Sequence, residues 1–358
     1  MMQFIKGMDV SMIKELENHG ACYYLKGNKE DIFSILKECS VNMIRLRLWR
    51  DPYSSDGESY GGGTNDLETT LELARRAKEN GMQVLLDIHY SDFWADPAKQ
   101  VKPKAWSKIS GAELEGTVYG YTALVLKEFK KNDLIPEMIQ IGNEITKGLL
   151  WPDGHIDRVS NMARLLKAGI KAARHVCPES KIVLHLDFGT NNELYRDWFK
   201  ALEPYNIDYD VIGMSYYPHW NGSIKELVDN MNDISKRYDK DVIVAETSIG
   251  YTLDDLGCKG IVYGENEEKA TGYPASQEGQ AKFLKDLYEA VRGVSDNHGI
   301  GVFYWEPEWL PIPDCTWGSP KGCDYMHDPV EAGNAMANQA LFDKNGNANE
   351  ALLALAGM

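Results

Sequence analysis

An alternation of short β-type runs with longer helical stretches, repeated along the chain, most restricts the possible fold. Eight runs rich in β-branched and aromatic residues predict strands, and the amphipathic stretches between them predict helices. One such stretch, DLETTLELARRAKENG at 66–81, has the acidic start and terminal glycine typical of a helix. The predicted strands span residues 3–11, 41–49, 83–90, 137–145, 181–189, 209–217, 241–248 and 301–309. The other predicted helices lie near 29–38, 111–131, 157–175, 190–202, 223–238, 276–293 and 330–341.

Eight such units in 358 residues fit one (β/α)8 TIM barrel that comprises residues 1–358 as a single domain. Two doubly wound domains fit less well, because no linker rich in Pro, Gly or Ser divides the chain. The extra length falls after predicted strands, where a barrel builds its active face. A purely decorative role for these elongated loops is the alternative. They span residues 50–65, 91–109, 249–275 and 310–329.

Charge and hydropathy restrict the partners. The net charge of -16 and pI near 5.0 argue against nucleic acid or an anionic membrane as a partner, whereas a neutral ligand is compatible. No run approaches the roughly 18 apolar residues of a membrane span, and the start MMQFIKGMDV lacks the features of a signal peptide. A cytoplasmic monomer is the favoured expectation, and a secreted protein whose leader has been removed is the alternative.

Six cysteines leave the disulfide state open. Cys258, Cys315 and Cys323 occur in loop-like segments, where one disulfide could form and one thiol would be left over. The other three cysteines lie in helical contexts and are expected to be free thiols.

Two glutamates occur where predicted strands end. The run EMIQIGNEI reaches Asn143 and Glu144 at the end of strand four, and VIVAETS reaches Glu246 at the end of strand seven. A barrel would deliver both carboxyls to one mouth. Either glutamate alone could be a satisfied strand-end carboxylate, but the pair predicts a catalytic site.

Further polar and aromatic side chains surround this predicted mouth. Arginines within a strand need acidic partners, and Asp9 or Asp87 could serve. His89 is interpreted as a residue that lines the site. Pyranose rings pack on aromatic faces while their hydroxyls need polar partners, so the composition favours a sugar ligand and glycosidic chemistry. The set comprises Arg45, Arg47, Asp87, His89, Tyr216, Tyr217, His219, Trp220, Trp305, Glu306 and Trp309.

Seven blocks make the chain resemble the endo-β-1,4-galactanases of glycoside hydrolase family 53 over roughly residues 4 to 342. The blocks most specific to this family are LLDIHYSDFWADPAKQ and IQIGNEITKGLLWPDG. The others are NMIRLRLW, GMSYYPHW, VIVAETS, GYPASQEGQ and GVFYWEPEW. The resemblance implies a retaining glycosidase that acts on β-1,4-galactan or type I arabinogalactan. Glu144 would be its acid/base, with a pKa raised by burial and by Glu246, the nucleophile.

The resemblance also implies roles for the surrounding residues. Asn143 would bind the hydroxyl beside the reacting carbon, and Arg45 would favour ionised Glu246. His89, Tyr217 and Trp305 match the family's strand-three, strand-six and strand-eight site positions. Further subsite candidates are Trp94, Trp106, His219 and Trp309.

No cofactor is expected to be required. Some bacterial relatives bind structural calcium after strand seven, but the acidic segment 251–274 lacks a regular ligand spacing. Another barrel glycosidase (a β-mannanase, an endoglucanase or an exo-acting β-galactosidase) and a non-catalytic carbohydrate-binding barrel are the alternatives. The chain has no HExxH, G-x-S-x-G or Walker A sequence to support a metal-dependent hydrolase, a serine hydrolase or a P-loop protein.

Overall fold

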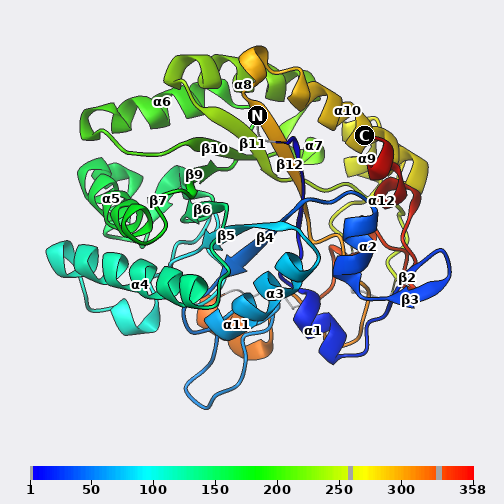
Figure 1. The fold of residues 1–358 in the computed structure, drawn as a ribbon, viewed down its shortest axis with the longest axis horizontal. Coiled ribbons are helices and arrows are strands. Elements are labelled where there is room, and N and C mark those ends of the chain that lie inside the picture. Colours follow the sequence, from blue (N-terminus) through cyan, green and yellow to red (C-terminus); the bar gives the residue numbers. More distant parts are fainter. Residues whose placement is uncertain (1–2, 257–260, 328–332) are drawn as a thin grey trace.

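The computed structural model describes residues 3–256, 261–327 and 333–358. Eight parallel strands close into a barrel in the order β1-β12-β11-β10-β9-β6-β5-β4 (Figure 1). Every predicted strand overlaps one of them, so the (β/α)8 prediction is confirmed. The strands are β1 (Ile5–Asp9), β4 (Met43–Leu48), β5 (Gln83–Ile88), β6 (Met138–Ile141), β9 (Lys181–Leu186), β10 (Val211–Ser215), β11 (Asp241–Glu246) and β12 (Gly299–Trp305).

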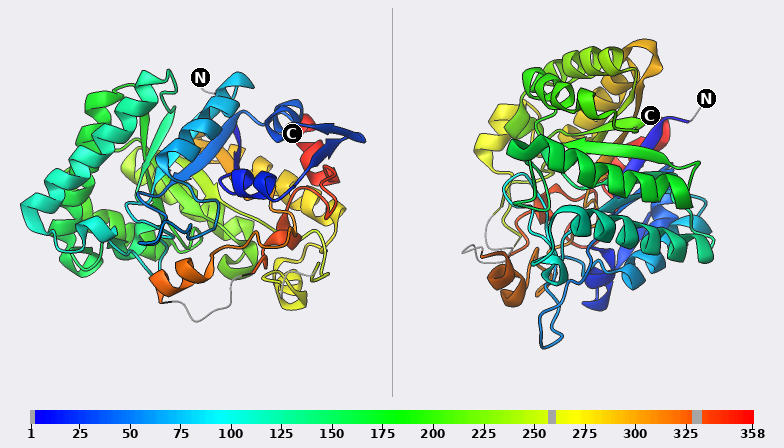
Figure 2. Two further views of the ribbon diagram at one scale, coloured as in Figure 1. Left: turned by 90° about the horizontal axis from the view of Figure 1, so that it is seen from below. Right: turned by 90° about the vertical axis from the view of Figure 1, so that its left-hand side faces the viewer.

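Helices surround the barrel, as Figure 1 shows. The longer ones are α2 (Ile32–Glu38), α3 (Leu67–Glu79), α4 (Gly111–Lys131), α5 (Val159–Val176), α6 (Asn192–Leu202), α8 (Ile224–Tyr238) and α10 (Gln277–Arg292). Shorter ones are α1 (Ile13–Asn18), α7 (Pro218–Asn221), α9 (Glu265–Thr271), α11 (Pro320–Met326) and α12 (Glu350–Ala354). Two small hairpins, β2 (Tyr23–Leu25) with β3 (Asn28–Glu30) and β7 (Gly148–Leu149) with β8 (Gly154–His155), complete the fold. In the left view of Figure 2 the termini lie at the top and α11 lies at the bottom, on the side of the loops that follow the strands.

Side chains fill the barrel interior in layers. Met43 of β4 belongs to an apolar cluster inside the ring, and Arg45 and Arg47 follow it at a spacing of two residues on the same face. Gly7 of β1 makes room for the ring of Phe303 in this cluster, because a Cβ at Gly7 would lie 2.2 Å from that ring. The apolar layer therefore supports a polar layer, which faces the loops after the strands.

The predicted helix at 330–341 is wrong for the residues that can be described. Residues 333–336 are not helical and Ala337–Gln339 form a single 3₁₀ turn, whereas 330–332 lie outside the described residues. The side chain of Asn338 donates hydrogen bonds of 2.8 Å to the carbonyls of Thr252 and Tyr263. Hydrogen bonds to the loop after β11 thus hold this segment in a non-helical conformation. The last α-helix along the chain is α12.

Candidate active site

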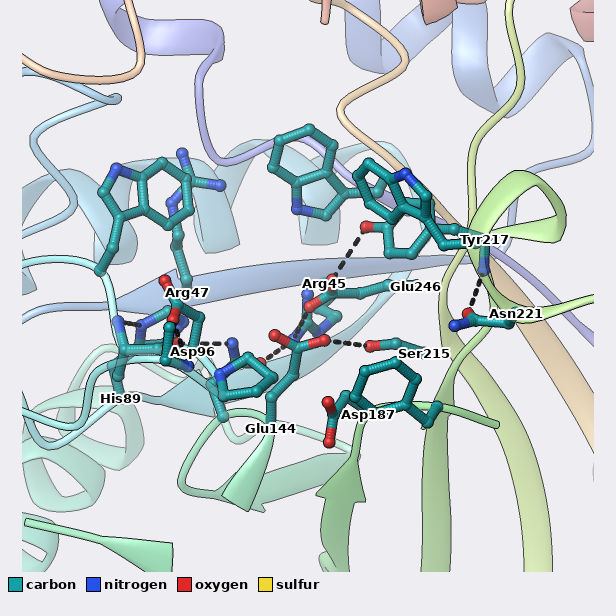
Figure 3. Close-up of a pocket in the computed structure, with 18 of the residues that line it drawn as sticks. Arg45, Arg47, His89, Asp96, Glu144, Asp187, Ser215, Tyr217, Asn221 and Glu246 are labelled. Atoms are coloured by element: carbon teal, nitrogen blue, oxygen red, sulfur yellow. Dashed lines mark hydrogen bonds and ion pairs between the residues drawn. The ribbon is translucent and has the colours of Figure 1, made fainter. Parts of the chain in front are cut away.

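A cavity of about 470 Å³ opens at the ends of the barrel strands. Glu144 and Glu246 both line it, from the ends of β6 and β11, which β9 and β10 separate in the barrel (Figure 3). The structure therefore brings together the two carboxyls that the strand ends predict. Other predicted site residues that line the cavity are Arg45, His89, Trp94, Asn143, Tyr217 and Trp305.

Arg45 links three buried carboxylates beneath the cavity. Its guanidinium lies 2.7 Å from Asp9, 2.8 Å from Asp87 and 2.9 Å from Glu246. Both acidic partners that the sequence suggests are thus present, together with the candidate nucleophile. Because these side chains are nearly excluded from water, the network offsets a large cost of burying charge.

Arg47 has a different environment. Its guanidinium pairs with the buried carboxylate of Glu306 and donates a 2.7 Å hydrogen bond to the carbonyl of Gly62. It also lies 4.3 Å from the centre of a ring of Trp94, close enough for a cation–π contact. Arg47 therefore holds the loop after β4 and a wall of the cavity in place.

Glu246 ends β11 and is held by two neighbours. Arg45 contacts one carboxylate oxygen, and the hydroxyl of Tyr217 donates a 3.0 Å hydrogen bond to the other. Burial raises the pKa of Glu246, while the charge of Arg45 and the hydrogen bond from Tyr217 oppose that rise. Burial and the charge of Glu246 raise the pKa of the Tyr217 phenol well above its usual value, so Tyr217 remains a donor.

Glu144 follows β6 in a left-handed conformation, with φ of 45°. Its Oε1 lies 2.6 Å from the hydroxyl of Ser215, at the end of β10. Burial raises the pKa of Glu144 well above its usual value, and the charges of Glu246 and Asp187 raise it further. The site thus contains one carboxyl that favours the protonated form and one that a cation helps to ionise.

Asn143 and His89 occupy fixed positions beside this pair. The amide of Asn143 donates a 2.9 Å hydrogen bond to the carbonyl of Ala95, and its Oδ1 accepts one of 2.9 Å from Arg45. Nδ1 of His89 faces the indole N–H of Trp49 at 3.2 Å and the backbone N–H of Ala95 at 3.3 Å. Nδ1 is therefore the acceptor, and Nε2–H points to Asp87 at 3.0 Å.

Aromatic side chains form walls of the cavity. Trp305 packs on Trp94 with ring centres 6.4 Å apart, and the Trp94 indole donates a 2.7 Å hydrogen bond to the carbonyl of Trp317. Phe188 and Trp220, which follow β9 and β10, are 48% and 57% exposed, although such large apolar side chains are usually covered. The cavity therefore offers aromatic surfaces of the kind that pack on sugar rings.

Three aromatic subsite candidates do not line the cavity. His219 packs against Trp220 and Tyr263, where burial lowers its pKa to about 4. Trp309 is buried behind Trp305 and donates a 2.7 Å hydrogen bond to Asn334. Trp106 lies within the loop after β5 and is buried against Tyr121 of α4. These three side chains belong to the packing of the loops.

The cavity also contains residues that the sequence did not single out. Asp187 follows β9 and Ser215 ends β10. The expectation that polar residues at strand ends line the site could therefore have identified both. Asp96 and Met336 lie within loops and carry no comparable signal. All four line the cavity, together with Phe188 and Asn221.

The described residues contain no group of three or more His, Cys, Asp or Glu side chains that could hold a metal ion. In the acidic segment 251–274, residues 257–260 lie outside the described part of the chain. Cys258 is among them, so a disulfide that includes it stays a prediction, while Cys315 is a buried free thiol. Across the same described ranges, no helix has the length and apolarity needed to cross a membrane.

Comparisons with curated proteins give consistent relatives. The chain is 39% identical to an endo-beta-1,4-galactanase of Bacillus subtilis, with 96% of this chain and 83% of that protein aligned. It is 36% identical to an arabinogalactan endo-beta-1,4-galactanase A of Aspergillus niger, with 94% of each chain aligned.

Solved structures and a family model agree with these relatives. The GH53 catalytic domain of Ignisphaera aggregans superposes with a TM-score of 0.93 at 41% identity, covering 99% of this chain and 95% of that one. A structure from a study of two fungal beta-1,4-galactanases has a TM-score of 0.82 at 30% identity, covering 99% of both chains. The model described as Glycosyl hydrolase family 53 matches residues 5–355. The chain therefore belongs to glycosyl hydrolase family 53.

Proposed function

We propose that this protein is an endo-β-1,4-galactanase that retains anomeric configuration, with Glu144 as acid/base and Glu246 as nucleophile. The pairing of Glu144, whose pKa burial raises, with a Glu246 held by Arg45 in one aromatic-lined cavity carries the proposal. The names of the Bacillus subtilis and Aspergillus niger relatives support β-1,4-galactan as the substrate. Galacto-oligosaccharides would be smaller substrates of the same site.

In the first step, a carboxylate oxygen of Glu246 attacks the anomeric carbon and forms a glycosyl ester. The glycosidic C–O bond breaks, and its oxygen takes the proton of Glu144. Arg45 and Tyr217 hold Glu246 in place and favour its ionised form before the attack. The raised pKa of Glu144 favours the protonated form that the acid needs in this step.

In the second step, Glu144 removes a proton from water, and the resulting oxygen nucleophile attacks the anomeric carbon. The ester bond breaks and Glu246 leaves as a carboxylate. While Glu246 is esterified it carries no charge, so one cause of the raised pKa of Glu144 is absent. Glu144 can therefore act as a base in this step.

The remaining wall residues would bind the sugar. Asn143, whose side chain is fixed by Ala95 and Arg45, would contact the hydroxyl next to the reacting carbon. Trp305 would lie under the ring, as an apolar platform. Further substrate contacts would come from His89, Trp94 and Tyr217, all of which line the cavity.

The test compares two variants on two substrates. Glu246→Ala should abolish turnover of galactan and still bind it. Glu144→Ala should slow galactan cleavage far more than cleavage of an aryl β-galactoside, whose good leaving group needs no acid. Equal loss on both substrates would contradict the role of Glu144. Cleavage of mannan or cellulose in place of galactan would contradict the substrate, and binding without any cleavage would favour a carbohydrate-binding barrel.

A further inference from the structure

A line of three polar side chains lies behind Glu144. Its Oε1 is 2.6 Å from Oγ of Ser215, and that hydroxyl is 2.9 Å from Nε2 of His185, which projects from β9. The other ring nitrogen of His185, Nδ1, lies 2.9 Å from Oδ1 of Asn143. Ser215 and Glu144 are both labelled in Figure 3, where a dashed line joins them.

The orientation of Asn143 fixes the tautomer of His185. The Asn143 amide nitrogen donates to the carbonyl of Ala95, and its Oδ1 accepts from Arg45, so an acceptor faces His185. The amide nitrogen of Gln140 also lies 3.1 Å from Nδ1, but its two hydrogens have acceptors in Asp87 at 2.7 Å and the carbonyl of Gly142 at 3.1 Å. Nδ1 of His185 therefore carries a hydrogen and donates it to Asn143 at 2.9 Å. Burial lowers the pKa of His185 well below its usual value, and the charge of Arg45 adds to this effect, so the ring is neutral and Nε2 is left with a lone pair.

Ser215 has one hydroxyl hydrogen and two polar neighbours. When that hydrogen points to Nε2 of His185, Oγ presents only lone pairs to Glu144. A carboxylate at Glu144 would then face these lone pairs with no hydrogen between the two oxygens. A carboxylic acid at Glu144 can instead donate its hydrogen to Oγ of Ser215. The 2.6 Å separation of the two oxygens fits an O–H···O hydrogen bond in either direction, so the tautomer of His185 decides which group donates.

We propose that Ser215 and His185 are positioning residues that hold the acid proton of Glu144 in the free enzyme. His185 takes up the Ser215 hydrogen, and Ser215 thereby becomes the acceptor for the Glu144 proton. When substrate binds, the glycosidic oxygen replaces Ser215 as the acceptor. After the proton has left, the Ser215 hydroxyl can rotate and donate to the Glu144 carboxylate. This inference rests on the acid/base role proposed for Glu144.

The charged groups around Glu144 and His185 favour a hydrogen bond from protonated Glu144 to Ser215. Glu246 from β11, Asp187 after β9 and Asp96 after β5 place negative charge around Glu144 and favour its protonated form. On the other side, the charge of Arg45 from β4 disfavours a positive charge on His185, and a proton added to His89 after β5 would act in the same sense. A neutral His185 and a protonated Glu144 are therefore the compatible pair.

Ser215→Ala tests the direction of the hydrogen bond. The basic limb of kcat/KM against pH for galactan reports the acid in the free enzyme. Loss of the acceptor destabilises protonated Glu144, so the limb should move to lower pH by about half a unit to one unit. If Ser215 instead donates to a carboxylate at Glu144, the limb should move to higher pH, and a shift upward or no shift would overturn the proposal. Ser235→Ala, at a buried serine of α8, is the matched control and should leave the limb in place.

Nitrogen-15 NMR tests the tautomer without any substrate. In histidine-labelled protein, His185 should show a protonated Nδ1 and an unprotonated Nε2 at neutral pH, with its signals identified by their loss in His185→Gln. A protonated Nε2 would overturn the proposal. Because this measurement does not depend on turnover, it separates a failure of this inference from a failure of the proposed galactanase activity.

Discussion

Replacing Arg45 by methionine would remove the cation that three buried carboxylates share while keeping a side chain of similar length. The ion pairs measure 2.7, 2.8 and 2.9 Å, and the side-chain exposure is 1% for Arg45 and at most 9% for Asp9, Asp87 and Glu246. Removal of one partner of a buried ion pair costs about 3–5 kcal/mol, because the other charge stays buried without compensation. We therefore expect Arg45→Met to lower the free energy of unfolding by at least this amount at pH 7.

The loss should depend on pH in a defined direction. Burial raises the pKa of Glu246 and Arg45 opposes it, so the pKa of folded Glu246 should rise in the variant. A carboxyl group whose pKa is higher in the folded than in the unfolded state destabilises the folded protein when it ionises. This destabilisation is complete above the folded pKa and disappears as pH falls towards the unfolded pKa of about 4.3. The deficit should therefore be larger at pH 7 than at pH 5.

Urea unfolding at both pH values measures this deficit. Arg237→Met is the control, because Arg237 forms a partly exposed pair with Asp233 on α8, and such pairs contribute about 0.3–0.5 kcal/mol. A deficit for Arg45→Met as small as that of the control, or equal at pH 5 and pH 7, would refute the reasoning.

Three further predictions concern the nucleophile, the barrel interior and metals. Tyr217→Phe removes a hydrogen bond that lowers the pKa of Glu246, so the acidic limb of kcat/KM should move to higher pH with a fall of about tenfold in rate; an unchanged limb would argue against the contact. Gly7→Ala places a Cβ 2.2 Å from the Phe303 ring and should cost about 1–3 kcal/mol in urea unfolding, whereas Gly116→Ala, on α4 with open space around it, should not destabilise. Galactan cleavage should persist in EDTA, because the proposed steps use only side chains of the protein; a fall in melting temperature without loss of rate would instead indicate a structural metal.

The strand pattern predicted the barrel and the two glutamates because both follow from local sequence. In a parallel barrel, the end of each strand points to one face, so Glu144 and Glu246 could be placed together without tertiary information. Arg45 could be assigned acidic partners for a similar reason, since a charge inside a strand must be paired.

Residues beyond the strand ends were harder to place. His219 and Trp309 follow strands closely, yet the paths of their loops direct both side chains away from the cavity and into the packed loops. No local sequence signal predicts that side-chain orientation. Ser215 is a common strand residue whose importance depends on a neighbour from β9. The segment 333–341 has an apparent helical pattern, but buried hydrogen bonds to the loop after β11 determine its conformation.

The most direct test of the central claim is an NMR time course of products from linear β-1,4-galactan, with Glu246→Ala as the inactive control. Retention and internal cleavage predict galacto-oligosaccharides of several lengths whose new reducing ends appear first as the β anomer. Initial α anomers would contradict the nucleophilic role of Glu246. Oligosaccharides released at an undiminished rate by Glu246→Ala would contradict the site itself.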